Sequence, residues 1–198
     1  EAIAELWCIG LRRARDTMGA TTQYGTRSAV LPLSRRYKAD RMYKVKTLDA
    51  KFATDTFYAD VKSLNQNTCA QIYSNKVGFA VCYPMIDAKG DRIGRSLNDF
   101  VNDFGVPRHL TFDGATAQKG KYTLFMKTIR KYQIKDHMSS PRRPNENPAE
   151  SAIRDLKLRW YRLQTKMNIP NMLWDYGISY VSETGNIIAN NSKYSKGR

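Results

Sequence analysis

The sequence predicts an α/β fold in which a mixed sheet of five strands is covered by helices. Segments rich in Phe, Thr, Tyr and Val alternate with segments whose apolar residues recur at helical spacing. Three strands come in succession with short turns between them, and later strands alternate with helices, which favours a mixed sheet. The chain has 198 residues and 41% hydrophobic content, enough for one sizeable domain and a smaller appendage.

Residues 1–47 differ in character from the rest of the chain. Their apolar residues recur at helical spacing and comprise Ala4, Trp7, Leu11, Ala14 and Met18. The pair Ile9-Gly10 interrupts them, as the turn of a helix-turn-helix would. A basic stretch with interleaved tyrosines follows, comprising Arg35, Arg36, Tyr37, Lys38, Arg41, Tyr43, Lys44 and Lys46. We predict a helical segment and a basic linker; the linker suits a phosphate-tracking arm, although a solvated linker has the same composition.

From residue 48 onward the pattern becomes regular. Strands are predicted at 51–61, 69–73, 79–83, 109–113 and 133–135, with helices around 97–104 and 122–132 before the fourth and fifth strands. A long helix from Pro148 and a last helix through 173–181 follow, and residues 191–198 form a polar tail. The RNase H-like fold uses this order, so we assign residues 48–190 to a core of that type.

The balance of charge points to a polyanionic partner. Thirty-three Lys and Arg residues against 18 Asp and Glu give a net charge of +15. Such a field favours nucleic acid, although a merely basic soluble protein has the same balance. No run of 18 apolar residues and no signal peptide is present, so no membrane attachment is expected. The first residue is not Met, and we expect the chain to be part of a longer protein.

Cysteine and histidine are few. Cys8, Cys69 and Cys82 form no CxxC pair, and their odd number argues for free thiols in a reducing compartment. His109 and His137 are the only histidines, so a zinc site of the usual spacing is not expected.

Three carboxylates stand out against this background. Asp55 lies within the first predicted strand, Asp113 ends the fourth, and Glu150 lies at the start of the long helix. The first and fourth strands of such a sheet can pair in parallel, which would bring the two aspartates together within reach of the helix. Clustered carboxylates repel unless a cation lies between them, and Mg²⁺ prefers such oxygen ligands.

Each carboxylate also has a simpler explanation. Asp113 precedes Gly114 and could be a turn residue. Asp60 is an alternative first acid, although it lies near the strand's end. Asn147, Pro148 and Glu150 have the spacing of a capping box, in which the glutamate reaches back to the N–H of the cap residue.

Several motifs resemble those of a known family. TDT at 54–56, FDGA at 112–115 and SPRRPNENPAES at 140–151 resemble the three catalytic blocks of retroviral and retrotransposon integrases. LPLSRRYKAD, TDTFYA, DGATAQ, NENPAES and NMLWDYG are most similar to the Ty1/copia group, particularly its diatom and algal lineage. The resemblance covers nearly the whole chain.

The resemblance implies an Asp-Asp-Glu triad of Asp55, Asp113 and Glu150. The last two are separated by 150 − 113 − 1 = 36 residues, where the family has about 35. It implies a metal-dependent polynucleotidyl transferase that trims element DNA ends and joins them to target DNA, using Mg²⁺ or Mn²⁺. It also implies double-stranded DNA as partner, self-association, synthesis within a cytoplasmic polyprotein and action in the nucleus.

Basic residues on the long helix fit this implied role. Arg154 and Lys157 follow Glu150 by four and seven residues and therefore share its helical face. The remaining residues expected to contact DNA are Arg142, Arg143, Asn147, Gln118 and Lys119. An apolar stripe of Ile153, Leu156, Trp160, Leu163 and Met167 is expected to pack on the sheet.

The sequence also departs from the family pattern. The family's His-His-Cys-Cys zinc domain has no counterpart, Arg142 replaces an aromatic residue, and Pro148 stands where Gly is common. Two other functions stay open. One is another RNase H-like metal nuclease or transposase, and the other is a non-catalytic DNA-binding scaffold from a decayed element.

Overall fold

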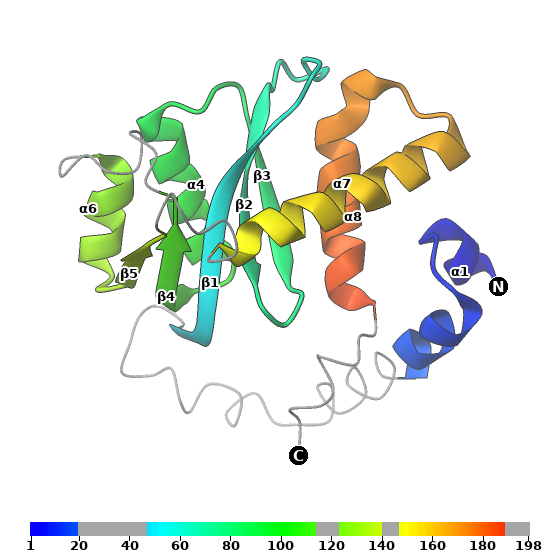
Figure 1. Ribbon diagram of the computed structural model, residues 1–198, viewed down its shortest axis with the longest axis horizontal. Coiled ribbons are helices and arrows are strands. Elements are labelled where there is room, and N and C mark those ends of the chain that lie inside the picture. The colour runs from blue at the N-terminus through cyan, green and yellow to red at the C-terminus, as the bar shows by residue number, and fades with distance from the viewer. Residues whose placement is uncertain (20–46, 114–122, 140–146, 189–198) are drawn as a thin grey trace.

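The sheet has five strands in the order β3-β2-β1-β4-β5. A computed structural model describes residues 1–19, 47–113, 123–139 and 147–188 (Figure 1). The strands are β1 Thr47–Tyr58, β2 Cys69–Asn75, β3 Ala80–Met85, β4 Val106–Phe112 and β5 Lys135–Met138. β2 runs antiparallel to β1 and β3, whereas β1, β4 and β5 run parallel. The predicted RNase H-like mixed sheet is therefore confirmed.

Helices cover both faces of this sheet (Figure 1). They are α4 Gly90–Asp103, α6 Leu124–Lys131, α7 Pro148–Met167 and α8 Trp174–Ile187, with a short 3₁₀ turn at Asn171–Leu173. Phe52 of β1 belongs to the core beneath α4 and α6, and Phe57 belongs to the core beneath α7 and α8. The two residues differ by an odd number of positions, so the alternation of a strand sends them to opposite faces.

A close approach fixes α7 against α8. An added Cβ at Gly177 of α8 would collide with the ring of Trp160 of α7. Glycine thus lets the indole lie directly on the α8 backbone, where Trp160 is 4% exposed. Of the predicted stripe, Leu156, Trp160 and Leu163 are buried and Ile153 packs at its edge, but Met167 is 47% exposed. Met167 lies in the last turn of α7, beyond the sheet.

The N-terminal segment forms two short helices, in which Ala4 and Ala14 are buried but Leu11 and Met18 are exposed. α1 covers Ala2–Leu6, a second helical stretch covers residues 11–19, and Ile9-Gly10 lies between them. The Lys166 ammonium donates a 2.8 Å hydrogen bond to the carbonyl of Glu5, and Cys8 packs against the core beneath α7 and α8. The basic stretch at 35–46 and the polar tail at 191–198 lie outside the described residues.

Several element boundaries differ from expectation: β1 begins at Thr47, α4 at Gly90 and β4 at Val106, each earlier than predicted. The fifth strand begins at Lys135 rather than Gln133, because Gln133 has a φ of 53° that ends the α6 turn. The first strand ends at Tyr58, so Asp60 lies outside the sheet and is exposed.

All three cysteines are free thiols. Among the described helices, none combines the length and apolar character that crossing a membrane requires.

Candidate active site

Strand register brings Asp55 beside Asp113. The last parallel pair between β1 and β4 is Thr54 with Phe112, and the next residue on each strand is one of the two aspartates. Phe112 belongs to the core beneath α4 and α6, so the position after it faces α7. Asp55 faces the same way, because it is two positions before Phe57, which packs against α7. Asp113 is exposed and Asp55 is half-buried.

The surroundings of Asp55 disfavour its negative charge. Burial raises the pKa of Asp55, the negative charges of Asp113 and Glu150 raise it further, and a hydrogen bond from the backbone N–H of Thr56 opposes the rise. That hydrogen bond is 2.7 Å long and fixes the orientation of the carboxylate. The two neighbouring charges come from different elements, β4 and α7. The charges of both other predicted acids therefore contribute to the pKa of Asp55.

The start of α7 determines where Glu150 lies. Asn147 caps the helix by accepting a 3.1 Å hydrogen bond from the N–H of Ala149. The Asn147 amide also donates a 3.4 Å hydrogen bond to the carbonyl of Thr54, the residue before Asp55. One side chain thus attaches the helix to the strand that carries the first aspartate.

The capping box formed only in part. The Asn147 cap is present, but Glu150 is exposed, and no hydrogen bond joins its carboxylate to the N–H of Asn147. The carboxylate is therefore not engaged at the helix start.

The three carboxylates suit a hard divalent cation in their chemistry. Among residues 1–19, 47–113, 123–139 and 147–188, no three His, Cys, Asp or Glu side chains lie close enough together to share one ion. Mg²⁺ nevertheless needs only one or two protein carboxylates, because water and substrate phosphate supply its other ligands. The repulsion felt by Asp55 is the observation that favours a cation here, since a cation would remove it.

A groove runs along α7 from Glu150 toward the helix's C-terminal half. It has a volume of about 840 Å³. Four residues predicted to act in the site line it, namely Asn147, Glu150, Arg154 and Lys157. Arg154 is exposed, whereas the Lys157 ammonium lies 4.8 Å from the centre of the Phe57 ring. Tyr161, which the sequence analysis did not single out, extends the same face by one further turn and is 50% exposed.

Four other predicted DNA contacts cannot be placed. Gln118 and Lys119 fall within 114–122, and Arg142 and Arg143 fall within 140–146, both outside the described residues.

A buried chain of hydrogen bonds supports β1 from its other face. The Thr56 hydroxyl donates to Oε1 of Gln71 at 2.8 Å, and the Gln71 amide donates to the Thr54 hydroxyl at 2.6 Å. Tyr73 continues the chain to Ser96 of α4 at 3.0 Å. Gln71, Thr54 and Tyr73 have no measurable exposure. Sequence reasoning missed this chain, because only strand pairing shows that Gln71 faces the residues flanking Asp55.

Comparison with known proteins identifies the class of fold. No protein-family model and no curated protein sequence matches the chain. The BIV integrase catalytic core domain superposes with a TM-score of 0.55 at 14% identity, over 69% of this chain and 83% of that one. The five-stranded sheet with flanking helices is the RNase H-like fold of an integrase catalytic core.

Two further structures have the same fold. One is a chain of the simian T-cell lymphotropic virus intasome in complex with PP2A regulatory subunit B56 gamma, with a TM-score of 0.57 and 17% identity over 71% of this chain. The present chain covers 50% of the length of that intasome chain. The other is the HTLV-2 integrase catalytic core domain in complex with magnesium, with a TM-score of 0.51 and 14% identity over 69% of this chain and 85% of that one.

Proposed function

We propose that this protein is the integrase of a Ty1/copia-like retrotransposon, a metal-dependent polynucleotidyl transferase that joins DNA ends to target DNA. The observation that carries the proposal is the convergence of charge on Asp55, whose pKa is raised by burial and also by Asp113 and Glu150. Carboxylates from β1, β4 and α7 then act together, as the sequence motifs imply. The integrase-core fold supports the same reaction class.

In this proposal each residue has a defined task. Asp55, Asp113 and Glu150 would hold Mg²⁺. Bound Mg²⁺ would stabilise the attacking and leaving oxygens of an in-line phosphoryl displacement. Arg154 and Lys157 bind phosphates of the DNA in the groove along α7, with Lys157 leaving the Phe57 ring to do so. Asn147 acts as a positioning residue, because it attaches the start of α7 to β1.

The remaining expectations belong to the same proposal. They are Mn²⁺ as a substitute metal, action on chromosomal DNA in the nucleus, origin from a polyprotein, and contact of Arg142, Arg143, Gln118 and Lys119 with DNA. Residues 1–47 form an accessory segment to a core at 48–190. Self-association is expected as well, since the HTLV-2 core occurs in dimeric and trimeric forms.

A joining assay tests the proposal. The 198-residue chain is incubated with Mg²⁺ or Mn²⁺, supercoiled plasmid and a labelled duplex with a recessed 3′-hydroxyl. Labelled plasmid should form only when metal is present. Asp55→Asn, Asp113→Asn and Glu150→Gln should each abolish it while retaining DNA binding. Matched controls are Asp91→Asn and Glu183→Gln, two exposed acids on α4 and α8.

The alternatives predict other results. Metal-dependent cutting of plasmid without joining would favour a nuclease of the same fold. DNA binding with neither cutting nor joining would favour a non-catalytic scaffold. Joining that survives Glu150→Gln would exclude the proposed triad.

A further inference from the structure

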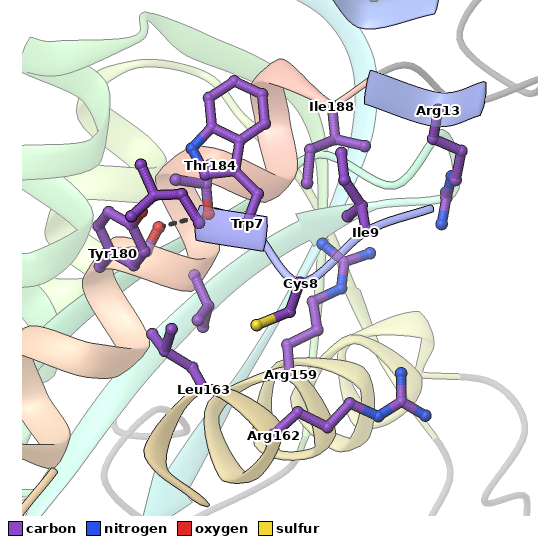
Figure 2. Close-up of a pocket in the computed structure, with 12 residues that line it drawn as sticks. Trp7, Cys8, Ile9, Arg13, Arg159, Arg162, Leu163, Tyr180, Thr184 and Ile188 are labelled. Carbon is purple, nitrogen blue, oxygen red and sulfur yellow. Dashed lines mark hydrogen bonds between the residues drawn. The ribbon is translucent and has the colours of Figure 1, made fainter. Parts of the chain in front are cut away.

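Three arginines line a second pocket, away from the carboxylates. The pocket lies between the N-terminal segment, α7 and α8 and has a volume of about 80 Å³ (Figure 2). Arg13 comes from the helical stretch 11–19, and Arg159 and Arg162 come from α7. In Figure 2, Arg13 and Arg159 extend toward the space between the N-terminal segment and α7, whereas the Arg162 side chain extends along α7 in another direction. A water needs about 10–15 Å³ of such space, so there is room for a larger ligand.

No salt bridge joins these guanidinium groups to an acid within the described residues, although the charge of Asp155 acts on Arg159. Within the described part of the chain, ion pairs join only Lys89 and Arg92 to Asp87, and Arg108 to Asp49. Burial lowers the pKa of Arg159; Asp155 opposes this change, and the positive charges of Arg13 and Arg162 reinforce it. Like charges that lie near one another repel, and an anion between them would relieve that repulsion.

The packing around Arg159 fixes its position. An added Cβ at Gly185 of α8 would collide with Nη1 of Arg159. The guanidinium therefore lies against the α8 backbone, where only glycine leaves space. Trp7, Cys8 and Ile9 form part of the opposite wall. The pocket is thus assembled from segments more than 140 residues apart in sequence, since 159 − 13 = 146.

The pocket cannot share one DNA segment with the active-site groove in a simple way. Arg159 follows Glu150 by 159 − 150 = 9 residues, which at about 100° per residue is half a turn of helix. Arg159 therefore faces away from Glu150, and Arg162, which follows Glu150 by 12 residues, lies about 120° round the helix from it.

We propose that Arg13, Arg159 and Arg162 bind a backbone phosphate of a second nucleic-acid segment, separate from the segment held at the carboxylates. Guanidinium forks match phosphate oxygens, and three of them suit one tetrahedral group. The net charge of +15 favours a polyanion over a single small ion. The sequence after residue 19 adds six basic residues between 35 and 46, which also favours an extended ligand. The proposal shares with the proposed function only the assumption that nucleic acid is the partner.

Salt dependence of DNA binding tests this inference. A labelled 30-base-pair duplex is titrated with the 198-residue chain in EDTA at several NaCl concentrations. Each phosphate contact contributes about 0.9 to the slope of log K against log salt, and the three arginines share one phosphate, so Arg159→Gln/Arg162→Gln should lower the slope by about 1. Affinity should fall about tenfold or more at low salt. The control Arg95→Gln/Lys127→Gln removes the same charge from exposed positions on α4 and α6 and should change the slope by less than about 0.5.

Two further variants separate structure from binding. Arg159→Lys/Arg162→Lys keeps the charge but loses the forks, so the slope should be kept while affinity falls. Gly185→Ala should displace the Arg159 guanidinium without unfolding α8, because Ala is the better helix former. It should lower the affinity for DNA, and it should lower the slope by less than Arg159→Gln/Arg162→Gln does. An equal slope in the wild type, Arg159→Gln/Arg162→Gln and the control would overturn the proposal.

Other ligands give distinguishable results. If the pocket binds free phosphate alone, sodium phosphate will raise the melting temperature above sodium chloride of equal ionic strength, and the DNA slope will not depend on the arginines. If the pocket binds an acidic protein segment, poly-glutamate will bind to the pocket without displacing DNA. Either result would overturn the nucleic-acid assignment. Asp113→Asn, which tests the active site, should leave the slope unchanged, so the two proposals fail independently.

Discussion

The two sides of α7 bring different charges together. On one side, the charges of Glu150 and of Asp113 at the end of β4 act on Asp55 of β1, although the three carboxylates do not lie close enough together to share one ion. On the other side, Arg159 and Arg162 meet Arg13 of the N-terminal segment. Asp55 on one side and Arg159 on the other have a pKa shifted toward the neutral form, with burial as the largest cause and like charges as a further cause. The comparison teaches that the charged form of each is disfavoured, and that a ligand of opposite charge would offset this cost.

Substitutions on the two sides of α7 should affect different activities, namely joining on one side and the salt dependence of DNA binding on the other. The loss of joining is the largest effect we expect. Glu150→Gln should lower joining by about 100-fold or more, because several kcal/mol of charge stabilisation depend on the metal site and each 1.36 kcal/mol is about tenfold. It should leave the salt slope of DNA binding unchanged. A gel assay of joining and a fluorescence titration measure the two quantities. A loss of both in Glu150→Gln, with the fold intact, would contradict the separation.

Mg²⁺ should stabilise the folded protein, and only through the carboxylate side of α7. At a Mg²⁺ concentration about 100 times Kd, binding adds about 2.7 kcal/mol, which is about 5–10 °C in Tm for a chain of this size. The gain should vanish in Asp55→Asn/Asp113→Asn and persist in Arg159→Gln/Arg162→Gln. Differential scanning fluorimetry with and without EDTA measures it. Equal stabilisation of both double variants would place the metal elsewhere.

The attachment of α7 to β1 should have an intermediate effect. Asn147→Ala removes the cap, at about 1 kcal/mol, and also the hydrogen bond to Thr54. Asn147→Asp keeps the capping oxygen but lacks the amide donor, so it isolates the second contact. Both Tm and joining should be measured. Asn147→Asp should retain most of the stability while lowering joining; unchanged joining would argue against a positioning role.

Neutralising Asp55 should stabilise the metal-free protein. Its folded pKa is raised, so the stability it contributes is present at low pH and is lost as pH rises through the folded pKa. Asp55→Asn should therefore raise Tm at pH 7, and the gain should shrink toward pH 4. Each kcal/mol corresponds to about 2–4 °C. Thermal melts in EDTA across this range test the prediction, and a gain that grows at low pH would contradict it.

The matching change on the arginine side should have the smallest effect. Arg159→Gln should raise Tm at low salt by about 1 °C, because the side chain is partly exposed and solvent screens its repulsion. The gain should disappear in about 0.5 M NaCl, where the Debye length is only a few ångströms. A gain of equal size in Arg95→Gln, an exposed control on α4, would show that net charge alone is responsible.

Much of the fold was predictable from local pattern. The meander of β1 to β3, the helix after it and the long helix from Pro148 followed from periodicity and from end signals such as Asn147. Periodicity works here because one side of each element must be buried. β5 was displaced by two residues, because it is a short edge strand whose four residues are all exposed. Such a strand carries no burial pattern to read.

The sequence by itself determined which acidic residues are the candidates for the proposed chemistry, and their order along the chain. Asp55, Asp113 and Glu150 were recognisable because motifs and spacing are local properties of the chain. Tertiary structure decided which charges meet. Parallel pairing of β1 with β4 set the two aspartates side by side, and packing of the N-terminal segment on α7 brought Arg13 to Arg159. No local pattern encodes a contact across 146 residues, because it depends on which apolar surfaces bury one another when the chain folds.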